Sequence, residues 1–449
     1  MPVFHDLALK NGSVVLADKT VQTTLYVRDG LISAIGENST THVADQTIEC
    51  TGLTILPGVI DTQVHFREPG MEKNETLESG SRAAVLGGVT GVFEMPNTSP
   101  PTTTLETLND KLNRARQHMW CDHAFYVGAT ADNADQCGFL ESHQGVAGIK
   151  IFMGSSTGDL LVADDSLIER VLRSGHRRIA VHAEDEARLQ ERLSYRIENE
   201  PASHPLWRDD LTALQATQRL LTLARKTGRR VHVLHVTTSE ELDLIAQHRD
   251  IASCEITPQH LTLTAEEAYP RLGTLAQMNP PIRSAAHRQA LWRWLEQGLP
   301  DVIGSDHAPH GQDAKEKPYP QSPSGMPGVQ TLVPIMLNHV AHHRLSLRRF
   351  VDLTSAGPQR LFGLVRKGRI SVGYDADFTI VDLKARWTIE PRWLASRCGW
   401  SPFTGAHITG KPIGTMIRGH RVMWEGTLAK HPIGQPFRFE ATEKPLYLC

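Results

Sequence analysis

Eight short segments rich in apolar and β-branched residues recur through the middle of the chain. These predicted strands cover residues 58–66, 91–97, 123–129, 148–152, 178–185, 230–238, 252–258 and 301–309. Longer stretches with helical periodicity separate several of them, such as 104–117 and 287–298. Strands that alternate with helices form parallel β-α-β units, and eight such units close into a barrel. The sequence therefore predicts a (β/α)8 barrel of the TIM type. An open, doubly wound sheet is less favoured, because no G-x-G-x-x-G motif follows the first strand.

The two ends of the chain have a different, strand-rich pattern. The apolar runs 7–15, 23–30 and 31–36 are broken by Asn11-Gly12 and Asp29-Gly30, two dipeptides typical of β-hairpin turns. Residues 368–383 and 414–428 likewise consist of short apolar runs typical of β-strands. We therefore expect residues 1–55 plus 366–449 to form one small β-sandwich domain, and residues 56–365 to form the barrel.

The composition is typical of a metabolic protein with a large core. The chain has 449 residues, 40% of them hydrophobic, and a formal net charge of -3, without the basic excess of most nucleic-acid binders. Neither a signal peptide nor an apolar run of roughly 20 residues is predicted. The six cysteines form no C-x-x-C pair, as is usual in a reducing compartment. We expect a cytoplasmic protein that acts on a small molecule, with no nucleic-acid or membrane partner.

Polar side chains stand at or near the C-terminal ends of six predicted strands. They are His65, Asn97, Lys150, His182, His235 and Asp306. In a (β/α)8 barrel these strand ends meet at one mouth, which carries the active site. A single histidine there would mean little in a chain with 22 histidines, but six converging polar residues are hard to explain by packing. Imidazoles and a carboxylate are ligands for Zn²⁺, so the pattern predicts a metal site.

Lys150 is the unusual member of this group, because a protonated ammonium cannot bind a metal. Reaction of its amine with CO₂ would create a carbamate, an anionic oxygen donor able to bridge two metals. The plainer alternative is a lysine paired with a carboxylate such as Asp306 or Asp61. The spacing alone leaves both interpretations open.

Nine motifs carry a resemblance that covers nearly the whole chain. They are TGLTILPGVIDTQVHFREPG (51–70), GGVTGVFEMPNTSPPT (87–102), GIKIFMGSSTGDLLV (148–162), AVHAED (180–185), HVLHVTT (232–238), CEITPQHL (254–261), MNPPIR (278–283), GSDHAPH (304–310) and GYDADFTIVDL (373–383). In this order along eight strands, they resemble the amidohydrolase superfamily and, within it, the dihydroorotases. The resemblance implies a barrel with a flanking β-domain and a cyclic amide as substrate.

The resemblance also implies roles for the metal-type residues. His65 is expected to be a metal ligand after the first strand, and Lys150 to carry the bridging carbamate. His182 and His235 are expected to bind the second metal. Asp306 is expected to be both a metal ligand and the catalytic acid and base. The cofactor implied is Zn²⁺, one or two ions per chain.

Further residues are expected to bind the substrate. By the resemblance, Arg67, Asn97 and His310 hold its carboxylate, and a guanidinium can do so with two parallel hydrogen bonds. Asn279 is expected to lie near the ring. Residues 307–330 are rich in Pro, Gly and charge. They are expected to be either a plain surface loop or a lid that closes over the site.

One residue departs from the family pattern. The first strand of the family carries His-x-His, whereas this chain has Gln63-Val64-His65. The carbonyl oxygen of Gln63 is a much weaker zinc ligand than imidazole. The departure leaves open a one-metal enzyme, a two-metal enzyme with an incomplete site, or a weakened activity.

Two other functions compete with a dihydroorotase activity. A hydantoinase or allantoinase would also use Lys150, whereas Arg67 and Asn97 favour a substrate with a carboxylate. Alternatively, Gln63 marks a catalytically weak subunit that scaffolds aspartate transcarbamoylase. A homo-oligomer is expected in either case, and metal content would separate enzyme from scaffold.

Overall fold

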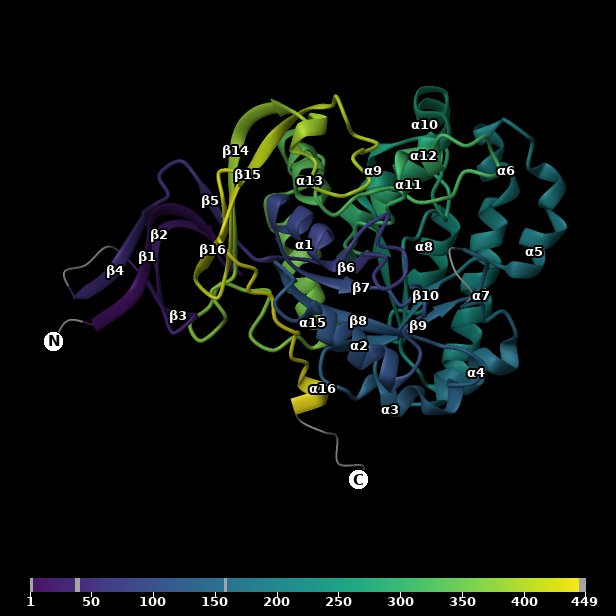
Figure 1. Ribbon diagram of the computed structural model, residues 1–449, viewed down its shortest axis with the longest axis horizontal. Helices are drawn as coiled ribbons and strands as arrows, with labels where there is room; N and C mark the ends of the chain where they lie inside the picture. The colour runs from purple at the N-terminus through teal and green to yellow at the C-terminus, as the bar shows by residue number, and fades with distance from the viewer. Residues whose placement is uncertain (1–2, 37–40, 157–159, 444–449) are drawn as a thin grey trace.

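The computed structural model describes residues 3–36, 41–156 and 160–443, and the middle of the chain forms a parallel eight-stranded sheet (Figure 1). Its strands are β6 (Val59–Val64), β7 (Val89–Glu94), β8 (Asp122–Gly128), β9 (Val146–Phe152), β10 (Ile179–His182), β11 (Val231–Val233), β12 (Ala252–Ile256) and β13 (Val302–Ile303). A parallel bridge between Val64 and His307 joins the first strand to the segment that follows the last. The backbone N–H of His65 also donates to the His307 carbonyl, at 2.7 Å. The predicted (β/α)8 barrel is confirmed.

Helices surround the barrel strands (Figure 1). The principal ones are α1 (Leu77–Leu86), α2 (Leu105–Ala115), α4 (Asp165–Arg173), α7 (Asp210–Thr227), α8 (Ser239–Ala246), α11 (Ala285–Glu296) and α13 (Leu332–Ala341). The predicted helices 104–117 and 287–298 correspond to α2 and α11. Thr76, Thr104 and Thr238 begin α1, α2 and α8 with reciprocal capping boxes, which satisfy backbone N–H groups that the helix leaves free. No helix among the described residues combines the length and apolar character needed to cross a bilayer.

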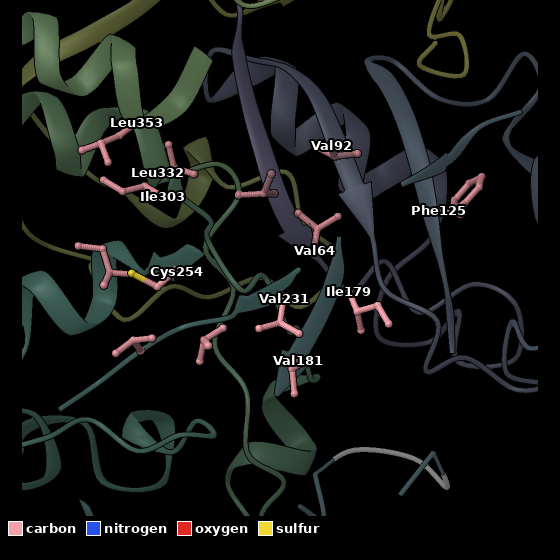
Figure 2. Packing of buried hydrophobic residues seen from close by; sticks show 14 of the residues in the cluster. Val64, Val92, Phe125, Ile179, Val181, Val231, Cys254, Ile303, Leu332 and Leu353 are labelled. Atoms are coloured by element: carbon pink, nitrogen blue, oxygen red, sulfur yellow. The ribbon is translucent and has the colours of Figure 1, made fainter. Parts of the chain in front are cut away.

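The main hydrophobic core lies between the strands and the helices (Figure 2). Successive side chains of a strand point to opposite faces, so Ile179 and Val181 of β10 pack into this core. Ala180 and His182 then face the barrel interior, where Ala180 belongs to a separate small cluster. His182 is the last residue of β10 and points inward, so it lies at the mouth of the barrel.

The strands from the two ends of the chain form a second, mixed sheet. They are β1 (Val3–Val15), β2 (Thr20–Arg28), β3 (Leu31–Gly36), β4 (His42–Glu49), β5 (Thr54–Pro57), β14 (Phe378–Thr388), β15 (His407–Ile417), β16 (His420–Trp424) and β17 (Thr427–Leu428). Since β5 pairs with both β1 and β14, it joins the N-terminal strands to the C-terminal ones. Figure 1 shows these purple and yellow strands side by side. A β-domain built from both termini is thus confirmed, while its boundaries at 1–55 and 366–449 stay a prediction.

One of the two predicted hairpins is wrong. Asp29-Gly30 does turn the chain, between Arg28 of β2 and its partner Leu31 of β3. Asn11-Gly12, in contrast, lies inside the continuous strand β1, at a bulge where the pairing register with β2 shifts. The N-terminal half of β1 pairs with β4 and its C-terminal half with β5. A bulge bends a strand, so this dipeptide redirects β1 between two partners and does not reverse it.

Candidate active site

The predicted site residues converge on one narrow cleft at the mouth of the barrel, with a cavity volume of about 20 Å³. Except for His310, all of them line it: Gln63, His65, Arg67, Asn97, Lys150, His182, His235, Asn279 and Asp306. His310 lies behind the cleft wall, with Nε2 3.3 Å from Nη2 of Arg67. Phe152, Ser156, Ala308, Ser324 and Gly325 complete the lining. Residues 157–159 of the third motif lie outside the described residues.

Three of these side chains stand on strained backbone. Arg67, His235 and Asp306 have φ angles of 64°, 37° and 45°, in the left-handed region that side chains disfavour. Each follows the last residue of a barrel strand by a few positions. Such strain persists only where the surrounding structure enforces it, and it concentrates at functional sites. The strained turns aim these side chains into the mouth of the barrel.

His182 and His235 form a pair suited to one metal ion. Nδ1 of His182 lies 3.1 Å from Nε2 of His235, and two nitrogen ligands of a tetrahedral zinc ion are about 3.3 Å apart. Burial lowers the pKa of both imidazoles, even though Glu184 raises that of His182. Both rings are therefore neutral at pH 7, which is the form that binds a metal.

A buried ion pair orients His182 from behind. Nε2 of His182 lies 2.8 Å from Oε2 of Glu184, which in turn accepts from the Arg208 guanidinium at 2.6 Å. Burial alone would raise the pKa of Glu184, but Arg208 and His182 together hold it well below its usual range. A carboxylate behind a histidine fixes the tautomer that presents Nδ1 to a metal. Neither Glu184 nor Arg208 is predicted from the sequence, although Glu184 stands in the A-V-H-A-E-D motif, two residues after His182.

His65 and Asp306 form a second pair. Nε2 of His65 is 3.2 Å from Oδ1 of Asp306, and its Nδ1 is 2.6 Å from Oδ1 of Asn97. Asn97 therefore orients His65, in addition to lining the cleft. Gln63 donates from Nε2 to Oδ1 of Asp306 at 3.0 Å, while its buried Oε1 finds no hydrogen-bond partner within the described chain. Burial raises the pKa of Asp306 to about 7, although nearby cations, Lys150 first among them, lower it.

Lys150 is buried near these two pairs and forms no ion pair with any of the described residues. Its Nζ lies 4.3 Å from the centroid of the Phe152 ring, and no ion pair to Asp306 or Asp61 forms. Asp61 instead accepts from the backbone N–H groups of Ser305 and Gln63. Burial lowers the pKa of Lys150 to about 7, so much of the amine is uncharged at neutral pH. The uncharged amine is the form that reacts with CO₂.

Arg67 presents a free donor beside this centre. Its Nε donates to the Pro309 carbonyl at 3.2 Å and its Nη2 faces His310, but its buried Nη1 has no partner within the described residues. Burial lowers the pKa of Arg67 to about 10, so the guanidinium is charged at neutral pH. A buried cationic donor without a partner is costly, and an anionic group in the cleft would satisfy it.

The nitrogen and oxygen donors of the cleft are of the types that bind zinc, but they do not form a complete coordination site. No three His, Cys, Asp or Glu side chains of the described residues already surround one point. Two imidazoles form one pair, and an imidazole with a carboxylate forms the other. Lys150 lies near both pairs, where an anionic derivative of its amine would supply the missing oxygen donor.

Comparisons with known proteins place the chain in a family. A model of the amidohydrolase family matches residues 54–422, so the chain belongs to that family. It is 37% identical to a dihydroorotase of Halobacterium salinarum, over 83% of this chain and 86% of the relative. It is 34% identical to an L-hydantoinase of Paenarthrobacter aurescens, over 96% and 97%. A solved L-hydantoinase (dihydropyrimidinase) from Arthrobacter aurescens superimposes with a TM-score of 0.91 at 31% identity, covering 96% of this chain and 99% of its own. Fold, family and relatives together define a metal-dependent cyclic amide hydrolase.

Proposed function

We propose that this enzyme is a dihydroorotase, which interconverts N-carbamoyl-L-aspartate and L-dihydroorotate. The observation that carries the proposal is the buried, unsatisfied Nη1 of Arg67, a residue that lines the cleft together with the histidines, Lys150 and Asp306. Among the cyclic amides hydrolysed by its relatives, dihydroorotate has a carboxylate on the ring that would accept this hydrogen bond. The similarity to a dihydroorotase at 37% identity supports the same substrate.

The residues fit zinc as the cofactor. His182 and His235 would hold one ion, together with a carbamate on Lys150 that would replace the uncharged amine. His65 and Asp306, together with the same derivative of Lys150, would hold a second ion. When bound, zinc would polarise the ring carbonyl and make water nucleophilic at neutral pH.

The side chains of the cleft account for the proton transfers and for substrate orientation. Asp306, with its pKa near 7, accepts the proton of the attacking water and returns it to the ring nitrogen that leaves. Arg67 binds the ring carboxylate, so the amide carbonyl turns toward the histidines. Asn279 is held by a hydrogen bond between its Oδ1 and Nε2 of His204, at 3.0 Å, and lies where the ring would sit.

Direct turnover measurements test the proposal. The protein with zinc should hydrolyse L-dihydroorotate, and cyclise N-carbamoyl-L-aspartate, faster than it opens hydantoin, allantoin or dihydrouracil. The high structural similarity to an L-hydantoinase favours hydantoinase as the second candidate. Faster opening of an L-hydantoin would overturn the dihydroorotase proposal in favour of that candidate. Folded protein that contains no zinc and turns over none of these rings would support the scaffold alternative.

Replacing Arg67 by methionine should weaken use of the carboxylate substrate. A hydrogen bond to a charged group is worth about 1.5–3 kcal/mol, so kcat/KM for dihydroorotate should fall about 10- to 150-fold. The measurement is steady-state kinetics with dihydroorotate and, in parallel, dihydrouracil, which has no carboxylate. Arg116→Met, at an exposed arginine of the barrel surface, is the matched control. An unchanged kcat/KM for dihydroorotate would show that its carboxylate binds elsewhere.

Gln63 should leave the second zinc position weak. Its amide points a donor, Nε2, at Asp306, whereas a ligand must offer a lone pair. We expect wild-type protein to hold between one and two zinc ions per chain after dialysis against a mild chelator. Gln63→His should raise the affinity of the second ion by at least about 10–100-fold. Changes in residues that only support metal ligands already have effects of that size. Elemental analysis measures both, and Gln312→His, at an exposed glutamine, controls for an added imidazole. Two tightly held ions in the wild type would refute this role of Gln63.

A further inference from the structure

Lys315 is a fully buried lysine in the loop that follows β13, at the end of the short helix α12 (Gln312–Lys315). Within the described residues it has no carboxylate partner. Its Nζ donates instead to three backbone carbonyls, those of Gln277 at 3.2 Å, Pro323 at 2.9 Å and Gly325 at 3.2 Å. Burial lowers the pKa of Lys315 to about 7, but its three carbonyl acceptors match the three protons of an ammonium and favour the charged form, whereas Lys150 has no such acceptors within the described residues. The loop is therefore folded around this one cation.

The three carbonyls belong to two segments that form one edge of the catalytic cleft. Gln277 stands two residues before Asn279, which lines the cleft, and Pro323 directly precedes the lining residues Ser324 and Gly325. The same segments are joined by a backbone hydrogen bond from Gly325 to the Gln277 carbonyl, at 2.9 Å. Lys315 thus ties together two parts of the cleft edge that are far apart in the chain.

This edge extends to the residues that face the substrate carboxylate. The Ser324 carbonyl lies 3.1 Å from Nε2 of His310, and His310 packs against Arg67. Gly325 packs closely against Ala308: a Cβ built on it would lie 2.4 Å from the Ala308 carbonyl oxygen, and its φ is +143°. A shift of the carbonyls around Lys315 would therefore reach His310 and Arg67.

We propose that Lys315 is a positioning residue of this enzyme, whose ammonium sets the shape of the Ser324–Gly325 edge and so the placement of the carboxylate end of the substrate. The substrate named in this proposal rests on the proposed function. The role of Lys315 in shaping the Ser324–Gly325 edge does not depend on which substrate the enzyme uses. It also assigns a role to the loop 307–330, which the sequence left open between a plain loop and a closing lid. Lys315 holds the middle of this loop against the same edge of the cleft.

Two further contacts hold Lys315 where this role requires it. The Thr274 hydroxyl donates to the backbone carbonyl of Lys315 at 2.5 Å. The Trp400 ring lies 5.7 Å from Nζ, and its Nε1 donates to the His310 carbonyl at 2.9 Å. Trp400 comes from the connection between β14 and β15, so the terminal sheet braces the same loop.

The test compares Lys315→Met with Lys317→Met, an exposed lysine two residues further along the loop. Hydrogen exchange of the amides of residues 322–326 should become at least about 10-fold faster in Lys315→Met and stay unchanged in the control. A misplacement of about 1 Å costs on the order of 100-fold, so kcat/KM for dihydroorotate should fall about 10- to 100-fold. The loss should be mainly in KM, and smaller for dihydrouracil, while zinc content stays that of the wild type.

The outcomes separate this proposal from the proposed function. If the wild type turned over none of the rings, the proposed function would fail, but the exchange measurement would still decide the role of Lys315. Unchanged exchange at 322–326 together with unchanged kinetics would overturn the proposal, as would an equal loss in the control. Should Lys315→Met not fold, Thr274→Val replaces it, because it removes only the hydroxyl that anchors the backbone of Lys315. Faster exchange of 322–326 is again expected, and wild-type exchange would overturn the proposal.

Discussion

Asp306→Asn is expected to abolish most of the turnover while leaving the protein folded. General acid–base catalysis contributes about 10²- to 10⁴-fold to rate, so kcat should fall by that factor. The fold should survive because asparagine keeps an oxygen that can accept the hydrogen bond from Nε2 of Gln63. Asp306 is buried, and burial raises its pKa to about 7, so it can give up and take back a proton near neutral pH.

Kinetics with dihydroorotate, circular dichroism and zinc analysis together test the role of Asp306. Asp313→Asn, at an exposed carboxylate of the following loop, should behave as the wild type. If Asp306→Asn retained near-wild-type turnover with its zinc in place, another group would have to move the proton. A variant that loses zinc along with turnover would instead assign Asp306 mainly to metal binding.

Glu184→Gln is expected to destabilise the protein strongly and to weaken zinc binding. Both Glu184 and Arg208 are buried, with side-chain exposures of 0% and 2%, so the substitution leaves the Arg208 guanidinium without its counter-charge. Breaking a buried pair in this way costs about 3–5 kcal/mol of unfolding free energy. The same carboxylate orients His182, and losing such a partner lowers metal affinity by about 10–100-fold.

Chemical denaturation of the zinc-free protein, and zinc titration of the folded protein, measure the two effects separately. Glu191→Gln, an exposed glutamate in the next helix, is the control. The pKa of Glu184 is depressed in the folded state, so its contribution is complete above its ordinary value of 4.5 and is lost as the pH falls toward the lower, folded-state pKa. The stability difference between wild type and variant should therefore shrink below pH 4.5. A difference under about 1 kcal/mol at pH 7 would mean that the pair contributes little.

Much of the barrel could be predicted because its signals are local. Each strand is a short apolar run, and the residue that ends it is next to it in the chain, as His65, His182 and Asp306 are. Barrel topology then brings all strand ends to one mouth, so residue type and position sufficed to predict which side chains meet. The helices α2 and α11 were predicted for the same reason, since helical periodicity is a local property.

The N-terminal sheet shows where local signals mislead. Asn11-Gly12 has the composition of a hairpin turn, yet it forms a bulge in β1, because the two halves of that strand pair with β4 and β5. Those partners begin about thirty to forty residues further along the chain, and a dipeptide contains no information about them. Strand pairing depends on burial and on neighbouring strands as much as on turn propensity.

The sequence by itself determined the barrel, the β-domain built from both termini and the set of polar residues that line the cleft. Only the tertiary structure revealed what holds that set in place. Glu184 and Arg208 are 24 positions apart, and Lys315 binds carbonyls 8, 10 and 38 positions away. The physical reason is that an ion pair, or a hydrogen bond from a lysine to a distant carbonyl, depends on distance and burial in the folded chain. Neither interaction leaves a periodic pattern in the sequence.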